Sequence, residues 1–242
     1  MVIEKLMIFD YIGWFFWTLT YIVIIITGAV NKKSKYVGIP VMPVLVNFSW
    51  EIASVVNPTN FVRVVWFLFD VFIVALIFQK QNLRYERKKL ISYTSFLFIC
   101  TVIFYFIFKN NDIVLPISSF FIDTVMAIIF LIQRKKIDSG NRVLIGVFKF
   151  LGDAFVWVYF ASFHPSISVL AAITFICNIV YIVYAVKEAK AQPEIQEEFK
   201  GNLKSAYAEV KRVIAKINKR RKPDIVHGKK KKKKKTKKTH RG

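Results

Sequence analysis

The sequence predicts an all-α membrane protein: a bundle of seven transmembrane helices followed by an amphipathic basic helix and a disordered Lys-rich tail. First, 55% of the 242 residues are hydrophobic and 16% are aromatic, which is more apolar than an ordinary soluble domain. Second, the apolar residues form long runs close to the roughly 20 residues that a helix needs to cross a bilayer. Third, the connections between these runs alternate between basic and almost uncharged.

The first predicted span covers residues 8–30 and follows a short N-terminal segment in which Glu4 stands beside Lys5. Its apolar run is too long for the hydrophobic region of a cleavable signal peptide, so we interpret it as a membrane helix. Cys100 and Cys177 fall inside later spans, which gives no indication of a disulfide framework. The remaining spans are expected at 39–56, 60–79, 90–108, 113–133, 143–162 and 166–186.

The loops between the spans predict the orientation of the protein. Basic residues concentrate in the loops at 31–38, 79–89 and 134–142. The loops at 57–60, 109–112 and 163–166 contain a single basic residue, Lys109. Because short cytoplasmic loops are enriched in Lys and Arg, the N-terminus is expected outside and the C-terminus in the cytoplasm. We therefore expect a multi-pass protein of the plasma membrane or the endoplasmic reticulum.

The composition changes after residue 186, and we divide the chain into a transmembrane domain (1–186), a cytoplasmic helical segment (187–222) and a tail (223–242). From residue 187 onward there are 21 Lys and Arg against 6 Asp and Glu, so most of the net charge of +22 lies here. Residues 194–220 show helical apolar spacing, which indicates a helix on the membrane surface, a short coiled coil or a partner-binding helix. The tail is expected to be disordered and to attract anionic lipid.

A carboxylic acid interrupts the second span. Glu51 lies one helical turn after Asn47 and beside Trp50, and this spacing places all three on one face of a helix. A charged residue at the centre of a membrane helix costs about 3 kcal/mol or more, so such a residue is a candidate functional group. We expect this face to meet other helices or a cavity rather than lipid.

Other ionisable residues also fall inside predicted spans. Lys149 and Asp153 are four residues apart and are expected to pair on one helix face. Arg63 lies near the outer end of its span, where it can extend to the interface. Asp70 and Asp123 have no basic partner on their own helices. They either pair with a cation on a neighbouring helix or belong to a functional site.

Several kinds of chemistry are not supported. The sequence contains no HExxH or CxxC motif, no paired histidines and no Asp-rich diphosphate-binding motif, so we expect no metal and no cofactor. The basic tail is not accompanied by an aromatic platform or folded module that would indicate nucleic-acid binding. What remains is a carboxylic acid among aromatic and amide side chains. An apolar setting favours the neutral form of such an acid, which can then donate a proton, while aromatic faces stabilise a transient cation.

Residues in the first three spans resemble a known family. The motif residues are Gly13, Trp14, Tyr21, Tyr36, Gly38, Met42, Pro43, Asn47, Trp50, Glu51, Trp66 and Asp70. This pattern is similar to the integral-membrane terpene cyclases of fungal meroterpenoid and indole-diterpene pathways. The resemblance implies seven helices, no metal, and protonation of the epoxide of a prenylated, lipophilic aromatic substrate by Glu51.

The resemblance also implies roles for other residues, and it departs from the family at one position. Asp70 joins Glu51 as a candidate catalytic residue, and the family's second acid is replaced here by Asn178, an amide that cannot protonate an epoxide. Asp70 or Asp153 would have to substitute for it. The candidate substrate-binding residues are Trp14, Tyr21, Asn47, Trp50, Trp66, Asp123, Asp153 and Asn178.

Two alternatives remain open. The Pro-x3-Asn-x2-Trp pattern is also similar to seven-helix transporters of sugars and vitamin precursors, and the chain could instead be a non-catalytic membrane scaffold. A cyclase predicts an apolar lateral pocket that ends at Glu51. A transporter predicts a polar site near the midplane between two three-helix halves. A scaffold predicts that a cationic or amide partner closes over Glu51.

Overall fold

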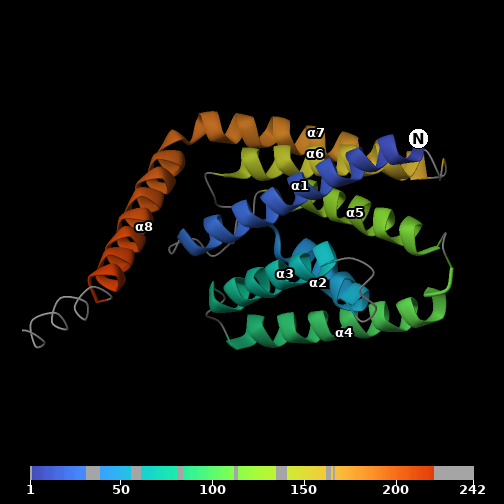
Figure 1. Ribbon diagram of the computed structural model, residues 1–242, viewed down its shortest axis with the longest axis horizontal. Coiled ribbons are helices and arrows are strands. Elements are labelled where there is room, and N and C mark those ends of the chain that lie inside the picture. The colour runs from blue at the N-terminus through green and yellow to red at the C-terminus, as the bar shows by residue number, and fades with distance from the viewer. Residues whose placement is uncertain are drawn as a thin grey trace, which may run out of the picture. The chain divides into compact units, whose positions relative to one another are not determined.

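The computed structural model describes residues 2–30, 39–55, 61–80, 84–111, 114–134, 141–161, 165 and 167–220, and almost all of them are helical. These residues form eight helices and no strand (Figure 1). The helices are α1 (Val2–Val30), α2 (Val41–Val55), α3 (Phe61–Lys80), α4 (Arg84–Phe108), α5 (Val114–Ile132), α6 (Arg142–Ala161), α7 (Ile167–Ala191) and α8 (Pro193–Arg220).

Each predicted span corresponds to one helix, with small differences at the ends. Five helices (α1, α3, α4, α6 and α7) are long and apolar enough to cross a membrane, whereas α2 and α5 contain the shorter apolar stretches Val41–Ile52 and Ile117–Ile132. Pro43 and Pro193 lie in the first turns of α2 and α8, where a missing backbone N–H does not break the helix. The predicted all-α fold is therefore confirmed for the described residues, and five of its helices have the length and composition of membrane spans.

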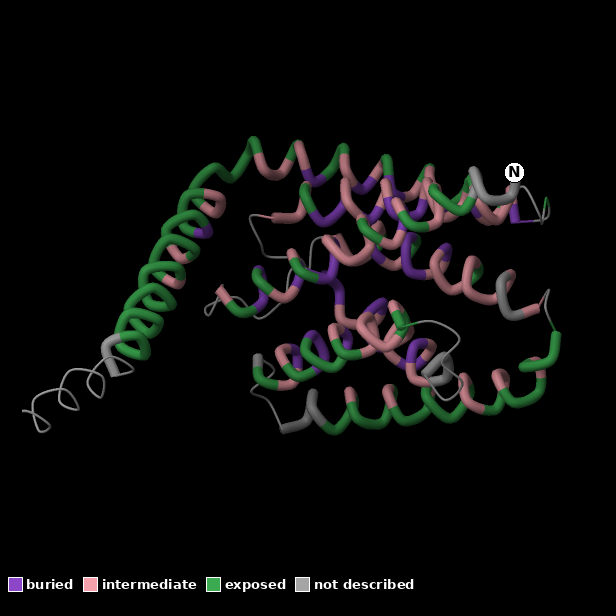
Figure 2. Tube along the Cα trace, viewed as in Figure 1, coloured by how far each residue is buried: buried purple, intermediate pink, exposed green. Residues whose placement is uncertain are grey.

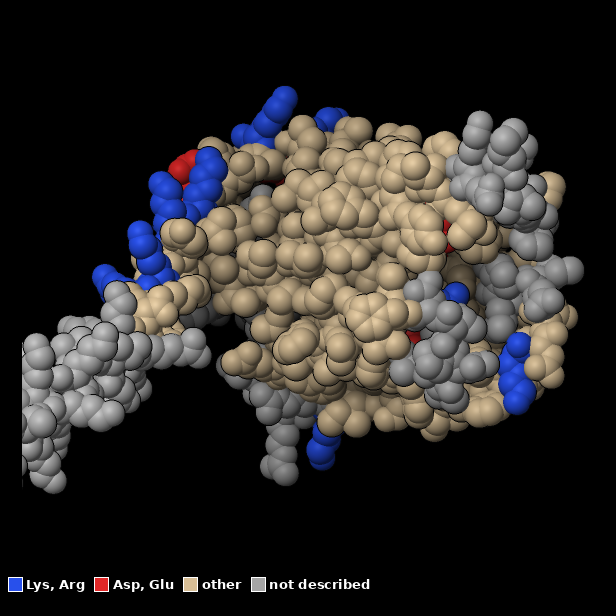
Figure 3. All heavy atoms as spheres, in the orientation of Figure 1, with Lys and Arg blue, Asp and Glu red and all other residues tan. Residues whose placement is uncertain are grey.

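The outer surfaces of these helices are apolar. On α4, no residue whose burial is described is buried (Figure 2). Its large apolar side chains include Phe96 (65% exposed) and Ile107 (67% exposed). On the visible face of Met1–Phe199, uncharged side chains form one broad area, and the visible Lys and Arg side chains lie mostly at its margins (Figure 3). Apolar surface of this extent is a liability in water but suits a lipid environment.

α1 contacts both α6 and α3, and it packs tightly against α6 at Gly13 of α1 and Gly152 of α6. A Cβ atom on Gly13 would lie 2.4 Å from Val156 Cγ2 and 2.9 Å from the Val156 backbone nitrogen. A Cβ atom on Gly152 would lie 2.7 Å from Trp17 Cδ1. Small residues let membrane helices approach closely and gain dispersion energy. Gly13, the first residue of the resemblance motif, therefore has a packing role.

Gly13→Ala is expected to lower the unfolding temperature of the protein in detergent micelles. The added methyl group forces α1 away from α6, and such overpacking costs about 1–3 kcal/mol. Alanine is favoured over glycine in a helix by about 1 kcal/mol, so helix propensity alone would raise the stability of the variant. A loss of stability would therefore report the overpacking. Gly201→Ala is the matched control, because nothing lies within 4 Å of a Cβ atom there. An equal response of the two variants would contradict the packing role of Gly13.

The chain divides into two compact units, Met1–Phe199 and Lys200–Gly242. α7 continues beyond the predicted span end at residue 186, and α8 begins at Pro193 after the single residue Gln192. The predicted amphipathic segment 194–220 is helical, as expected. The predicted disordered tail at 223–242 lies outside the described residues, as do the predicted loops at 31–38 and 57–60 and most of those at 134–142 and 163–166.

Candidate functional site

Three helices bring four polar side chains together in what we call the Glu51 cluster: Tyr21 of α1, Asn47 and Glu51 of α2, and Asp70 of α3. The amide Nδ2 of Asn47 donates hydrogen bonds to Tyr21 Oη at 2.6 Å and to Asp70 Oδ2 at 2.8 Å. The Tyr21 hydroxyl also lies close to the Asp70 carboxyl. Asp70 is only 2% exposed. These contacts fix the rotation of α2 against α1 and α3.

Glu51 is the least satisfied member of this cluster. It is 8% exposed, and its Oε2 atom is buried without a hydrogen-bond partner in the described part of the chain. The Asp70 carboxyl and the exposed Arg63 guanidinium both interact with it electrostatically. A buried polar atom without a partner is costly and rare in native structures, so it is a candidate for contact with a ligand.

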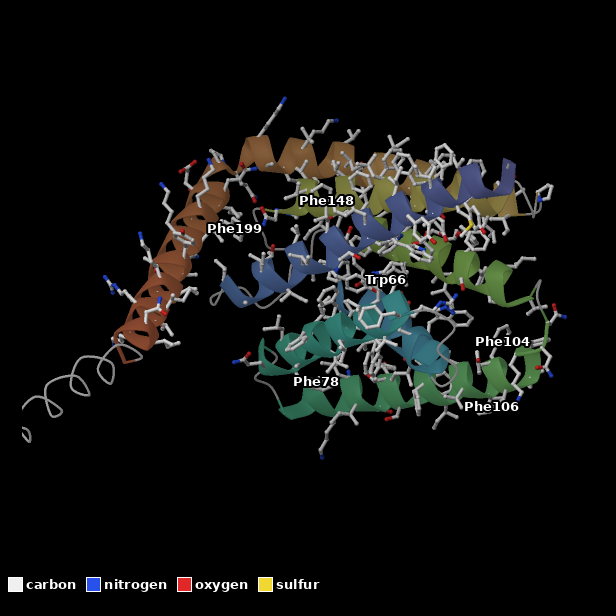
Figure 4. All side chains as sticks on the ribbon, in the orientation of Figure 1. Trp66, Phe78, Phe104, Phe106, Phe148 and Phe199 are labelled. Carbon is white, nitrogen blue, oxygen red and sulfur yellow. The ribbon has the colours of Figure 1, made fainter. Side chains whose placement is uncertain are left out.

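Aromatic rings adjoin the Glu51 cluster on the α1–α3 side. The ring of Trp66 stacks on that of Tyr21 with centroids 6.3 Å apart and meets Trp14 edge-on at 6.5 Å. Trp66 Nε1 donates to Thr18 Oγ1 at 3.1 Å, which holds the indole against α1 (Figure 4). The Trp14 indole lies near the Asp10 carboxyl. Three of the predicted substrate-binding aromatics are therefore neighbours.

Trp50 is directed elsewhere. Its ring lies 6.3 Å from that of Phe104 on α4, so it packs between α2 and α4. The spacing of Asn47, Trp50 and Glu51 predicted one shared face. In the structure that face meets three neighbouring helices, because Asn47 contacts α1 and α3 while Trp50 contacts α4.

A second group of polar side chains, which we call the Lys149 cluster, contains Asp123 of α5, Lys149 and Asp153 of α6, and Asn178 of α7. Lys149 Nζ donates to Asp123 Oδ1 at 2.7 Å and to Asp153 Oδ2 at 2.5 Å. Asn178 Nδ2 donates to the same Asp153 oxygen at 2.7 Å. The side chain of Lys149 is 4% exposed. The predicted Lys149–Asp153 pair is confirmed, and Asp123 finds a cation on a neighbouring helix.

Trp17 of α1 lies between the two clusters. Its ring centroid is 5.0 Å from Lys149 Nζ and 6.2 Å from the centroid of Tyr21. Trp17 was not among the predicted site residues. Its spacing was nevertheless informative, because Trp14, Trp17 and Tyr21 are three and four residues apart and therefore share one helix face. A cation over a desolvated tryptophan face adds to the stability of the Lys149 cluster.

Apart from Trp50, the predicted site residues therefore separate into two groups. Tyr21, Asn47, Glu51 and Asp70 come together, with Trp14 and Trp66 beside them. Asp123, Asp153 and Asn178 form the other group around Lys149. Asn178, which replaces the acid expected from the resemblance, hydrogen bonds to the carboxyl of Asp153. Within the described residues, no three His, Cys, Asp or Glu side chains are grouped so that they could hold a metal ion.

Comparison of the chain with protein-family models, curated proteins and solved structures found no match. The fold and the two clusters nevertheless define a coarse class, an all-helical membrane protein with buried carboxyl groups in its bundle. Chemically, the two clusters differ in the surroundings of their carboxyl groups. Both clusters contain a buried carboxyl oxygen without a hydrogen-bond partner among the described residues, Asp153 Oδ1 and Glu51 Oε2. In the Lys149 cluster an ammonium group contacts the other oxygen of that Asp153 carboxyl, whereas aromatic rings lie beside the Glu51 cluster.

Proposed function

We propose that this protein is a membrane-embedded cyclase in which Glu51 protonates the epoxide of a prenylated, lipophilic substrate. The observation that supports this proposal best is the buried Glu51 Oε2, which has no hydrogen-bond partner among the described residues. A neutral carboxylic acid in a water-poor site is suited to general-acid catalysis. The resemblance of residues 13–70 to membrane terpene cyclases points to the same group.

The proposed reaction is an isomerisation. The Glu51 proton moves to the epoxide oxygen, a C–O bond of the epoxide breaks, and the more substituted carbon becomes cationic. A double bond of the prenyl chain then attacks that carbon, which closes a ring and leaves a new cation. This cation loses a proton to the Glu51 carboxylate, so the product has the same composition as the substrate. Trp14, Tyr21 and Trp66 present aromatic faces that would stabilise the cation. Asn47 and Tyr21 would hold Asp70 in place.

The topology that accompanies this proposal has all seven helices α1–α7 crossing the membrane, with the N-terminus outside and the C-terminus in the cytoplasm. The alternation of basic and uncharged loops supports this orientation. α2 and α5 would then be short spans, which a bilayer accommodates by local thinning. The protein would reside in the plasma membrane or the endoplasmic reticulum.

One observation favours a transporter as the second candidate. An acid-initiated cyclisation at Glu51 does not require the Lys149 cluster, which lies on α5, α6 and α7 rather than on α2 and α3. Ionisable clusters inside a membrane protein commonly mark proton or ion pathways. In this alternative, Asn47 and the aromatic rings would contact a polar solute, and the Lys149 cluster would exchange a proton during transport.

Incubation of membranes that contain the protein with an epoxidised farnesyl phenol tests the proposal. We expect a product with the mass of the substrate, a new ring and a hydroxyl group in place of the epoxide, detected by liquid chromatography and mass spectrometry. Membranes without the protein provide the control. Recovery of the unchanged epoxide would contradict the cyclase. Proton-dependent uptake of a sugar or vitamin precursor into sealed vesicles would then identify the transporter.

A further inference from the structure

α8 begins where the last candidate membrane helix ends. α7 contains the candidate span Ile167–Ala191, and only Gln192 separates it from Pro193 of α8. A bilayer surface is therefore within reach of α8 wherever α7 crosses the membrane. Because of this connection, lipid is the nearest apolar environment in which α8 could bury an apolar face.

The charge of α8 reverses along its length. Residues 193–199 contain Glu194, Glu197 and Glu198 and no basic residue. Residues 200–220 contain seven Lys and Arg and the single acidic residue Glu209. The reversal coincides with the boundary between the compact units at Phe199 and Lys200. Glu194, Glu197 and Glu198 of α8 thus belong to the first unit, and its basic residues within 200–220 belong to the second.

The basic part carries an unpartnered apolar face, which we call the apolar arc. Its members recur every three or four residues and so lie on one side of the helix. All of them are exposed, and Tyr207 is exposed by 71%. Lys200, Lys204 and Lys211 follow one edge of this arc. The members are Leu203, Tyr207, Val210, Val213, Ile214 and Ile217.

We propose that residues 200–220 lie on an anionic lipid surface, with the apolar arc inserted at the level of the headgroups and the basic side chains in contact with acidic lipids. An amphipathic helix with lysines beside its apolar face binds such surfaces through buried apolar area and electrostatic attraction together. A second copy of the helix is a poorer occupant, because basic residues would face basic residues across the contact. This inference is independent of the proposed cyclase activity.

Fluorescent labelling of the full chain tests this inference. The labelling background replaces Cys100 and Cys177 with serine, and a nitrobenzoxadiazole dye is attached either at Tyr207→Cys in the arc or at Ala208→Cys on the other side of the helix. The protein is reconstituted into phosphatidylcholine vesicles with or without phosphatidylserine. With phosphatidylserine, we expect the dye at residue 207 to shift to shorter wavelength and to be quenched by spin-labelled lipid, while the dye at residue 208 stays in water. High salt should weaken the response.

A pair of charge variants separates the arc from general electrostatics. Val210→Asp with Ile214→Asp places two carboxylates in the arc, and Ala208→Asp with Ala215→Asp places the same two charges on the opposite side. We expect the first pair to reduce lipid quenching at residue 207 to the level of residue 208, and the second pair to retain most of it. Alanine is the better helix former, so the control loses at least as much helix propensity.

Three outcomes would overturn the inference. A water-exposed dye at residue 207 in phosphatidylserine vesicles would show that the arc does not meet lipid. Equal loss of quenching in both charge variants would assign binding to net charge alone. A blue-shifted dye that lipid-borne quenchers do not reach, with or without phosphatidylserine, would show that a protein surface covers the arc instead.

Discussion

Glu51→Gln is expected to reduce the rate of cyclisation by roughly 10²–10⁴-fold, the range typical for loss of a positioned general acid. Glutamine has nearly the shape of glutamic acid, but its amide cannot transfer a proton to an epoxide oxygen. The reaction would lose the step that creates the cation, whereas the aromatic neighbours Trp14 and Trp66 would stay in place. The measurement is the initial rate of product formation per amount of protein, with the epoxidised farnesyl phenol as substrate.

The folded state of this variant must be measured alongside its rate. The glutamine amide is a buried donor at a position where Glu51 Oε2 has no described partner, and an unsatisfied buried group costs about 1–3 kcal/mol. A modest decrease in unfolding temperature is therefore expected, without loss of the fold. Glu209→Gln makes the same chemical change on the exposed surface of α8 and should leave the rate unchanged. Full activity in Glu51→Gln would refute the assigned role.

Contacts within one helix were accessible from the sequence. Lys149 and Asp153 are four residues apart, and this spacing alone predicts their pairing, which the structure contains. The helices themselves followed from the length of the apolar runs. α4 begins at Arg84 rather than near residue 90, because the charged residues before the apolar run are good helix formers and extend the helix beyond its apolar part.

Contacts between helices were not accessible in the same way. Asn47 meets Asp70, and Asp153 meets Asn178, only because each pair of helices has one relative rotation and depth. A single sequence gives the face on which a residue lies but not the partner of that face. Trp17 was missed for a related reason: it stands in the aromatic segment Gly-Trp-Phe-Phe-Trp, where an apolar run hides the helical spacing that links it to Tyr21.

Lys149→Met is expected to destabilise the protein by about 3–5 kcal/mol, the range observed when one partner of a buried ion pair is removed. Methionine fills a similar volume, but Asp123 and Asp153 would lose the ammonium group that contacts both of them. Asp153 would retain only the amide of Asn178 among its described donors. The measurement is the free energy of unfolding in detergent micelles. Lys187→Met on the exposed part of α7 is the matched control and should change stability little.

Removal of the carboxylates together with the lysine separates lost charge compensation from lost packing. The triple variant Lys149→Met, Asp123→Asn, Asp153→Asn contains no buried charge in this cluster, and neutral replacement of a buried ionic group is often tolerated. We therefore expect the triple variant to recover most of the stability that Lys149→Met loses, although it carries more substitutions. If the triple variant is instead the less stable of the two, the contribution of Lys149 lies in its packing against Trp17 rather than in the neutralisation of Asp123 and Asp153.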